Sequence, residues 1–229
     1  MAETSDDKPH YLGHRQRLRE RFLADGGTGF QDYELLEFLL TLAIPRRDTK
    51  PLAKALIDRF GSFAEVIAAS SEQLAEFEVS EATIAALKIV EASAVRMAQR
   101  QAVGKPVLSS WQKVLDYCHA AMARQPEEHF RILFLDRKNK LIRDEEQQSG
   151  TVNHAPVYPR EVMKRALELG ASAIIMVHNH PSGDPAPSAA DVAMTHEVRD
   201  VGQKLGVTLH DHLIIGREGH ASLKALGLI

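Results

Sequence analysis

The sequence predicts an α/β (α+β) fold in its second half, a mixed sheet flanked by helices, preceded by an all-α region. No alternation of apolar and polar residues, the mark of a half-buried strand, occurs in about the first hundred residues. Beyond about residue 110, short apolar runs of strand type alternate with segments of helical period. One run, Ala173–Val177, is apolar throughout, which is typical of a strand buried on both faces of a sheet.

The first half contains the start and stop signals of a series of helices. Leu18 and Phe22, four residues apart, predict an amphipathic helix that ends before a group of glycines. Serine and proline residues supply the start signals of the helices that follow. The expected helices cover residues 14–23, 33–40 (capped by Gln31 or Asp32), 49–60, 63–69, a short helix capped by Ser71, and 81–100 (capped by Ser80).

The helical pattern stops at residues 102–110, which contain Gly104, Pro106 and two serines. We therefore expect a disordered lead-in at 1–12, a helical domain at 13–103 and a second domain at 107–229. The expected elements of the second domain are a helix at 111–123, strands at 129–135 and from 141, a helix at 159–169, a strand at 173–177, a helix at 189–205 and closing strands at 207–209 and 213–215.

The composition limits the classes of protein to which this chain can belong. The chain has 229 residues, of which 44% are apolar and 26% charged, and these values are ordinary for a globular protein. No run of about 18 apolar residues occurs, so we expect no membrane span and no membrane partner. The polar, acidic start is not of the secretory type, and the single cysteine, Cys118, excludes an internal disulfide framework. Together these features predict a cytoplasmic protein.

A histidine pair, His178 and His180, follows directly after the apolar strand. Residues i and i+2 of a strand point to the same side, so both imidazoles can reach one point just beyond the sheet. A stiff loop with three prolines and a glycine comes next. A helix is then expected to begin after Ser188, with Asp191 in its first turn, where the helix dipole keeps a carboxylate ionised.

These residue types suggest a metal site. Two neutral imidazoles and one carboxylate suit a catalytic Zn²⁺ whose fourth position stays open for water. Water in that position loses its proton near neutral pH and becomes a nucleophile. Each residue also has an ordinary explanation, such as Ser188 as a helix cap and Asp191 as a helix-start acid. The joint spacing, His-x-His, seven residues, Ser, two residues, Asp, favours a site that holds one zinc ion per chain.

The same spacing matches the signature of the JAMM metalloproteases, in the Jab/MPN superfamily. The second half as a whole resembles the RadC family of that superfamily. The segments that carry the resemblance are the strand at Phe130–Leu135, Gly150–Thr151, Tyr158–Val162, His178–Ser188 and Asp211–Gly216.

The resemblance implies an MPN-type fold and the hydrolysis of an amide or isopeptide bond in a peptide or protein substrate. It makes His178, His180 and Asp191 the zinc ligands. It also implies that Glu128 acts as general acid and base toward the attacking water, and that Ser188 hydrogen-bonds the oxyanion that develops on the substrate carbonyl. Other acids stay open as the base: Glu145, Glu146 and Glu161.

Two further histidines, His210 and His212, flank Asp211 near the expected last strand. We favour a structural role or a place at the rim of the site for them, and a contact that orients a zinc ligand is the alternative. Cys118 lies on an apolar helix face and is expected in the core. Two other histidines are expected on the surface: His154 and His196.

The first half resembles the helical domain that precedes the MPN domain in RadC proteins, which is related to helix-hairpin-helix DNA-binding units. Such units bind phosphate through a Gly-x-Gly turn, but the matching turn, Glu78–Val79–Ser80, lacks both glycines. The net charge of −3 also weighs against DNA, and we interpret the arginines of the first helix as a solvated face. A DNA-associated repair or recombination module with the MPN domain as scaffold, and a purely structural zinc site, stay the alternatives to a hydrolase.

Overall fold

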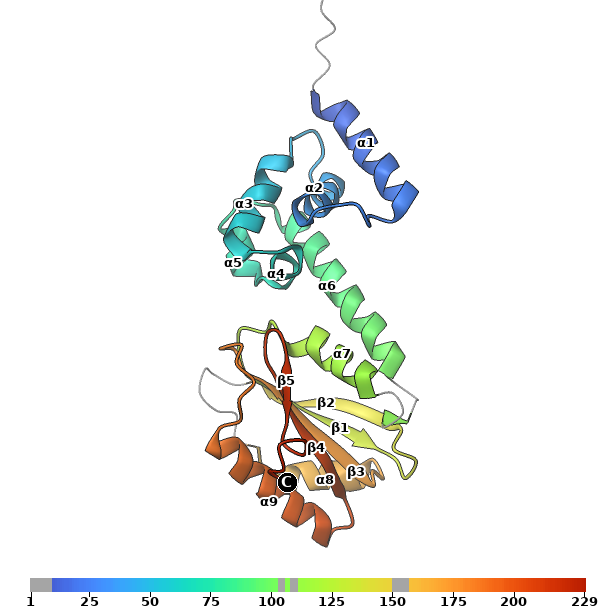
Figure 1. The fold of residues 1–229 in the computed structure, drawn as a ribbon, viewed down its shortest axis with the longest axis vertical. Helices are drawn as coiled ribbons and strands as arrows, with labels where there is room; N and C mark the ends of the chain where they lie inside the picture. Colours follow the sequence, from blue (N-terminus) through green and yellow to red (C-terminus); the bar gives the residue numbers. More distant parts are fainter. Residues whose placement is uncertain (1–9, 103–105, 108–110, 150–156) are drawn as a thin grey trace, which may run out of the picture. The chain divides into compact units, whose positions relative to one another are not determined.

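The computed structural model describes residues 10–102, 106–107, 111–149 and 157–229 (Figure 1). The chain divides into two compact units, a helical unit that extends to Ala92 and a sheet unit from Ser93 to Ile229. The domain boundary expected between residues 103 and 107 falls partly outside the described residues and stays a prediction. None of the helices in the described ranges is long and apolar enough to cross a membrane.

The helical unit contains the helices that the sequence predicts, with ends shifted by a few residues. Leucines spaced along these helices pack into one core, among them Leu36, Leu56 and Leu87. The helices are α1 (His10–Asp25), α2 (Asp32–Ala43), α3 (Lys50–Phe60), α4 (Phe63–Ala68), α5 (Ser71–Ala75) and α6 (Glu81–Ala102), which continues past Ala92.

Two helix starts differ from expectation. α1 begins at His10, so residues 10–12 are helical rather than part of a disordered lead-in, and residues 1–9 lie outside the described part of the chain. The helix passes through Gly13 because one glycine costs a helix only about 1 kcal/mol. Ser70 rather than Ser71 caps α5, because Gln73 lies three residues after Ser70 and closes a reciprocal capping box with it.

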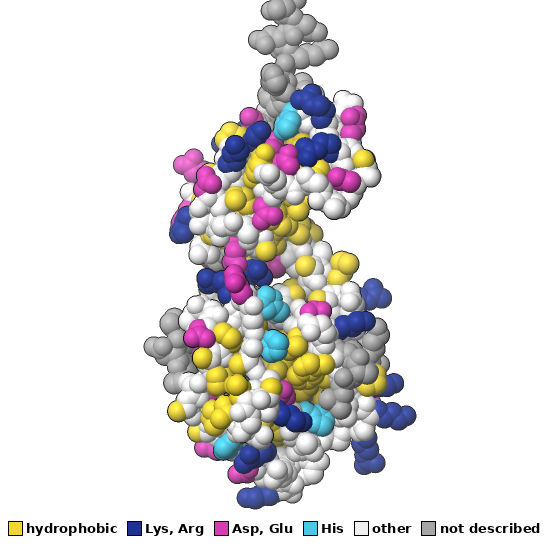
Figure 2. Space-filling model, viewed as in Figure 1, with side chains coloured by type: hydrophobic (Ala, Val, Ile, Leu, Met, Phe, Trp, Pro, Cys, Tyr) yellow, Lys and Arg dark blue, Asp and Glu magenta, His cyan; other side chains and the backbone are white. Residues whose placement is uncertain are grey.

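Polar contacts join the helices of this unit. His14 and the buried carboxylate of Glu37 share a hydrogen bond of 2.7 Å, which ties α1 to α2. Arg21 pairs with Glu34 at 3.0 Å across the same two helices. On the face shown in Figure 2, basic and acidic side chains are interspersed over this unit, as is typical of solvated helix faces.

The sheet unit is built on five strands in the order β2-β1-β3-β4-β5. β3 and β4 are parallel, and the other neighbouring pairs are antiparallel. The elements of the unit, beyond the end of α6, are α7 (Trp111–Met122), β1 (His129–Leu135), β2 (Leu141–Ser149), α8 (Pro159–Glu168), β3 (Ala173–Asn179), α9 (Ala189–Lys204), β4 (Thr208–Ile215) and β5 (His220–Ser222).

Helices cover both faces of this sheet, so the mixed sheet flanked by helices is confirmed. Alternate residues of the central strand β3 face opposite layers. Ile175 and Val177 pack with α7, whereas Ile174 and Met176 pack with α8 and α9. All residues of β3 are buried, which explains why its sequence is an uninterrupted apolar run up to His178.

Three strands of the sheet, β2, β4 and β5, differ from the prediction. The two closing strands expected at 207–209 and 213–215 are wrong, because one continuous strand, β4, spans the polar residues between them. Those residues find partners inside the protein: Asp211, for example, accepts hydrogen bonds from the Ser222 hydroxyl and the Lys224 N–H. β2 extends to Ser149 as a polar edge strand, and the short strand β5 was not predicted.

Candidate metal centre

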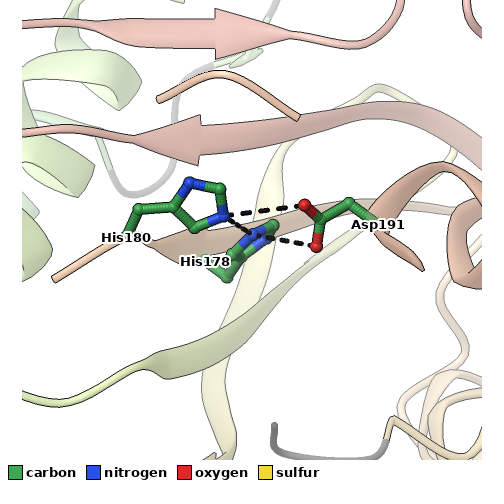
Figure 3. Close-up of side chains that lie close together, drawn as sticks. All are labelled: His178, His180 and Asp191. Atoms are coloured by element: carbon green, nitrogen blue, oxygen red, sulfur yellow. Dashed lines mark hydrogen bonds and ion pairs between the residues drawn. The ribbon is translucent and has the colours of Figure 1, made fainter. Parts of the chain in front are cut away.

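The predicted ligands His178, His180 and Asp191 come together at the end of β3 (Figure 3). His178 is the penultimate residue of β3 and is completely buried. His180 lies just beyond the strand, where its N–H donates to the Ile215 carbonyl oxygen at 3.0 Å and continues the pairing with β4. Asp191 lies in the first turn of α9. Strand and helix geometry thus bring together residues that the sequence places 13 positions apart (178 to 191).

The ligand atoms of this cluster face one another at short range. Nε2 of His178 lies 3.0 Å from Nε2 of His180 and 3.3 Å from Oδ1 of Asp191, and Nε2 of His180 lies 3.6 Å from Oδ2 of Asp191. Nδ1 of His180 donates to the Asp184 carbonyl oxygen at 2.8 Å, so its other nitrogen is directed at the centre. Groups rich in lone pairs repel at these distances unless a cation, either a proton or a metal ion, lies among them.

The close approach of these three side chains and their burial shift their pKa values. Burial lowers the pKa of His178 to about 4, against the opposing effect of the Asp191 charge. A hydrogen bond to Asp191 is the main cause that raises the pKa of His180, and the charge of Glu128 adds to it. Burial opposes ionisation of Asp191, but hydrogen bonds from its neighbours and the charge of His178 hold its pKa below the usual range. A neutral His178 and an ionised Asp191 are the states that metal binding requires.

Ser188 fixes the orientation of the Asp191 carboxylate. Both the backbone N–H and the hydroxyl of Ser188 donate to Oδ2 of Asp191 at 2.7 Å. The Asp191 N–H donates back to the Ser188 hydroxyl oxygen at 3.2 Å, which completes a capping box at the start of α9. The predicted helix cap is therefore confirmed, and it leaves Oδ1 of Asp191 directed at His178.

Behind His178 lies a second buried imidazole, that of His212 on β4. Nδ1 of His178 is 2.8 Å from Nε2 of His212, whose Nδ1 is 2.6 Å from the hydroxyl oxygen of Thr195 on α9. A place for His212 at the rim of the site is therefore wrong, and the alternative, a contact that orients a predicted ligand, agrees with the structure. His210 points elsewhere and hydrogen-bonds Asn139 at 2.7 Å.

Glu128 directly precedes β1 and is partly buried, close enough for its charge to act on His180. Its segment is held by Asn179, a completely buried residue at the end of β3. The Asn179 side chain accepts from the His129 N–H at 2.8 Å and donates to the Glu127 carbonyl oxygen at 2.9 Å. Asn179 therefore clamps the backbone on both sides of Glu128 against the strand that carries the histidines.

The other acids that the sequence left open as the general base are paired with basic side chains. Glu145 forms a bidentate pair with Arg165, and each of its two contacts is 2.7 Å long. Glu146 bonds His129 and Arg131, and Glu161 lies 3.0 Å from the adjacent Arg160. The structure thus gives each rival a partner elsewhere in the sheet unit.

A loop connects the histidine pair to α9, and it is anchored to the turn between β4 and β5. The Arg217 N–H donates to the Gly183 carbonyl oxygen at 3.0 Å. Gly216 is required at this crossing, because a Cβ there would lie 2.4 Å from the same oxygen. The anchored loop presents the Asp184 carbonyl that orients His180.

Two residues that support this cluster, Thr195 and Asn179, were not predicted from the sequence. Thr195 lies four residues after Asp191, so helical spacing places it on the same face of α9. Asn179 stands between the two histidines and must point to the opposite face of the strand. Among the remaining predictions, Cys118 is buried as expected and burial raises its pKa to about 12. His196 is partly buried and bonds the Leu228 carbonyl oxygen, and His154 lies outside the described residues.

Comparison with known proteins agrees with the geometry of the sheet unit. Residues 108–228, more than half of the chain, match the family model described as the RadC-like JAB domain. The chain belongs to the RadC family. It is 60% identical to a UPF0758 protein of Rhodobacter capsulatus over 93% of this chain and 100% of the relative. It is 56% identical to a UPF0758 protein of Ruegeria pomeroyi over 96% of this chain and 100% of that relative. Neither name states a reaction for these relatives of the RadC chain.

Proposed function

We propose that this chain is a zinc-dependent metallohydrolase that cleaves an amide or isopeptide bond in a peptide or protein. The observation that supports it best is the convergence of His178, His180 and Asp191, whose ligand atoms all lie within 4.8 Å of one another. This donor set fits zinc, because calcium and magnesium take oxygen ligands whereas imidazole with carboxylate suits zinc. Three protein ligands are typical of a catalytic zinc site, since a structural site is closed by a fourth.

The site is accessible from one side. The side chains of His180 and Asp191 are 19% and 13% exposed, whereas that of His178 is fully buried. A substrate carbonyl group can therefore approach past His180 and Asp191. Zinc held by these residues supplies a Lewis acid that polarises the carbonyl group and makes water acidic enough to attack it.

Glu128 is the residue that we assign as general base. A base must lie within hydrogen-bond reach of the water whose proton it takes, and the influence of Glu128 on His180 indicates that it is close to the site. It accepts the proton of the attacking water and passes it to the leaving amine. Asn179 keeps the Glu128 segment in register with the histidine strand during both transfers.

Ser188 is the residue that we assign to the oxyanion. In this structure its hydroxyl proton is donated to Oδ2 of Asp191. Stabilising the oxyanion therefore requires the hydroxyl to rotate toward the substrate, while its backbone N–H continues to hold Asp191. The capping and the catalytic role are thus compatible.

Metal content of the purified full chain is the first test. After reconstitution with Zn²⁺, we expect about one zinc per chain in the wild type, measured by elemental analysis, and none retained by His178→Ala or Asp191→Ala. His220→Ala is the matched control, because His220 is exposed on β5 and lies outside the cluster. A reconstituted wild type without zinc would exclude the proposal.

Hydrolysis is tested on a defined mixture of synthetic peptides with ordinary and lysine-linked isopeptide bonds, in ¹⁸O-labelled water. Cleavage by water places the label in each new carboxylate, so mass spectrometry identifies whichever bond in the mixture is cleaved. We expect labelled products from the zinc-loaded wild type and none from Asp191→Ala. Zinc-loaded protein that labels neither bond class would contradict a hydrolase of this kind.

A further inference from the structure

A chain of buried hydrogen bonds leads from His178 through His212 to Thr195, and all of these side chains are completely buried. The contacts between the two imidazoles and between His212 and Thr195 measure 2.8 and 2.6 Å. Oγ1 of Thr195 in turn lies 2.5 Å from the backbone carbonyl oxygen of Asp191. Each contact holds one proton, and the direction of donation along the chain follows from the chemistry of its ends.

The Asp191 carbonyl oxygen fixes this direction. A carbonyl oxygen only accepts, and two oxygen atoms so close repel unless a proton lies between them. The single hydroxyl proton of Thr195 is therefore donated to Asp191. Thr195 then offers only lone pairs to its other partner, so Nδ1 of His212 carries a hydrogen and donates it.

The charge of His212 decides the next contact. Its two ring nitrogens bond a hydroxyl group and another buried imidazole, and burying a cation beside uncharged partners is strongly disfavoured. A neutral His212 with its hydrogen on Nδ1 has a lone pair on Nε2. That lone pair accepts from Nδ1–H of His178. A neutral His178 then keeps its own lone pair on Nε2, the atom that faces His180 and Asp191.

We propose that Thr195 and His212 are positioning residues that fix the tautomer of His178, so that Nε2 presents its lone pair to the metal ion. The inference rests on the metal-binding part of the proposed function and does not depend on hydrolysis. Without this chain, the hydrogen of His178 can occupy either nitrogen, and the form with hydrogen on Nε2 has no lone pair on the atom that faces His180 and Asp191. Because Thr195 donates to the Asp191 backbone, the same chain links ligands on β3 and α9 through β4.

Nuclear magnetic resonance of the metal-free, ¹⁵N-labelled full chain tests the tautomers directly. Two-bond nitrogen–proton correlations distinguish an imidazole with hydrogen on Nδ1 from one with hydrogen on Nε2, and single-histidine variants assign the signals. We expect His178 and His212 both to carry hydrogen on Nδ1. Hydrogen on Nε2 of either one would overturn the proposal. The readout needs neither zinc nor substrate, so failure of the hydrolase proposal would not be mistaken for failure of this one.

Zinc affinity provides the second test. Thr195→Val is close to threonine in shape but removes the hydroxyl, and Thr195→Ser retains it as the matched control. We expect the zinc Kd, measured by competition with a chelating dye, to rise about 10–100-fold in the valine variant and to stay near the wild-type value in the serine variant. A folded Thr195→Val with unchanged tautomers and unchanged Kd would refute the proposal. If that variant does not fold, the tautomers seen in the wild-type spectrum still test the proposal.

Discussion

Buried polar side chains are distributed differently in the two units. In the described part of the helical unit they are Glu37, Thr49 and Thr83, and in the sheet unit they are His178, Asn179, Thr195, Asp211 and His212. Those of the helical unit join neighbouring helices or helix turns: Glu37 bonds His14, and the Thr49 hydroxyl donates to the Glu37 carbonyl oxygen. In the sheet unit, His178, His212, Thr195 and Asp211 are joined by hydrogen bonds. Asn179 lies on the other face of β3 and bonds the backbone on both sides of Glu128.

The buried polar side chains of the helical unit stabilise its packing, whereas we propose that those of the sheet unit also support a functional site. An unmade hydrogen bond costs a buried polar group about 1–3 kcal/mol, so a fold that needs only packing places few such groups and separates them. The group in the sheet unit is larger, and four of its five members are joined by hydrogen bonds. Its members hold the imidazole of His178, the proposed metal ligand, together with the segment that carries Glu128 and the backbone of β4. The buried, hydrogen-bonded group therefore lies directly behind the proposed metal ligands.

The largest effect is expected at Glu128, the proposed general base, whose segment Asn179 holds. We expect Glu128→Gln to lower kcat about 10²–10⁴-fold while zinc content stays unchanged, because the amide keeps the shape but accepts no proton. The rate of labelled product formation measures kcat. Glu127→Gln is the matched control, since it removes the same charge from the adjacent, exposed residue and should act like the wild type. Equal losses in both variants would indicate that local charge, rather than proton transfer, is what matters.

Substitutions of Asn179 and Glu37 allow a direct comparison of the two units. We expect alanine at either position to lower the free energy of unfolding by about 1–3 kcal/mol, because each change removes the hydrogen bonds of a buried polar side chain. Only Asn179→Ala should also lower kcat, about 10–100-fold, since misplacing a catalytic group by about 1 Å has an effect of that size. Urea denaturation and turnover are the two measurements. If Glu37→Ala lowers kcat as strongly, the distinction between the units fails.

The pH dependence of stability tests the buried side of the metal centre. In the metal-free protein burial lowers the pKa of His178 to about 4, from 6.5 in the unfolded chain. Between these values the unfolded chain binds more protons, so stability is present above pH 6.5 and is lost as the pH falls. From pH 7 to pH 5 we expect this residue to remove about 2 kcal/mol, seen as a lower Tm.

The control for this effect is His178→Gln, which removes the titrating group and should make Tm less sensitive to pH over the same range. The raised pKa of His180 acts in the opposite sense, but it does so in both proteins. The difference between wild type and variant therefore isolates His178. An identical pH dependence in the two proteins would show that His178 is not held neutral by burial.

The sequence predicted those parts of the site that are local in the chain. His178, His180 and Asp191 follow from strand and helix periodicity over a short segment, and Ser188 follows from capping preferences. The partners from distant elements could not be predicted, because they depend on strand register: His212 lies opposite Met176 only once β3 and β4 pair in parallel. The polar residues in the middle of β4 suggested two separate strands for the same reason. Their partners lie on other elements, which the sequence does not reveal.

A turn in the helical unit offers the smallest expected effect, and a gain instead of a loss. Glu78 has a φ of 53°, in the left-handed region, within the turn between α5 and α6. That conformation costs a side-chain-bearing residue about 1–2 kcal/mol, and glycine avoids the cost at an entropic penalty of about 0.5–1 kcal/mol. We expect Glu78→Gly to raise the free energy of unfolding by about 0.5–1 kcal/mol, measured by urea denaturation.

The neighbouring Glu76 supplies the control, because it is equally exposed but has a helical φ of −57°. Glycine there removes no strain and should destabilise the unit by about 0.5–1 kcal/mol. Opposite signs for the two variants would show that the turn imposes a left-handed backbone conformation on Glu78. Equal losses would show that Glu78 is relaxed in this turn.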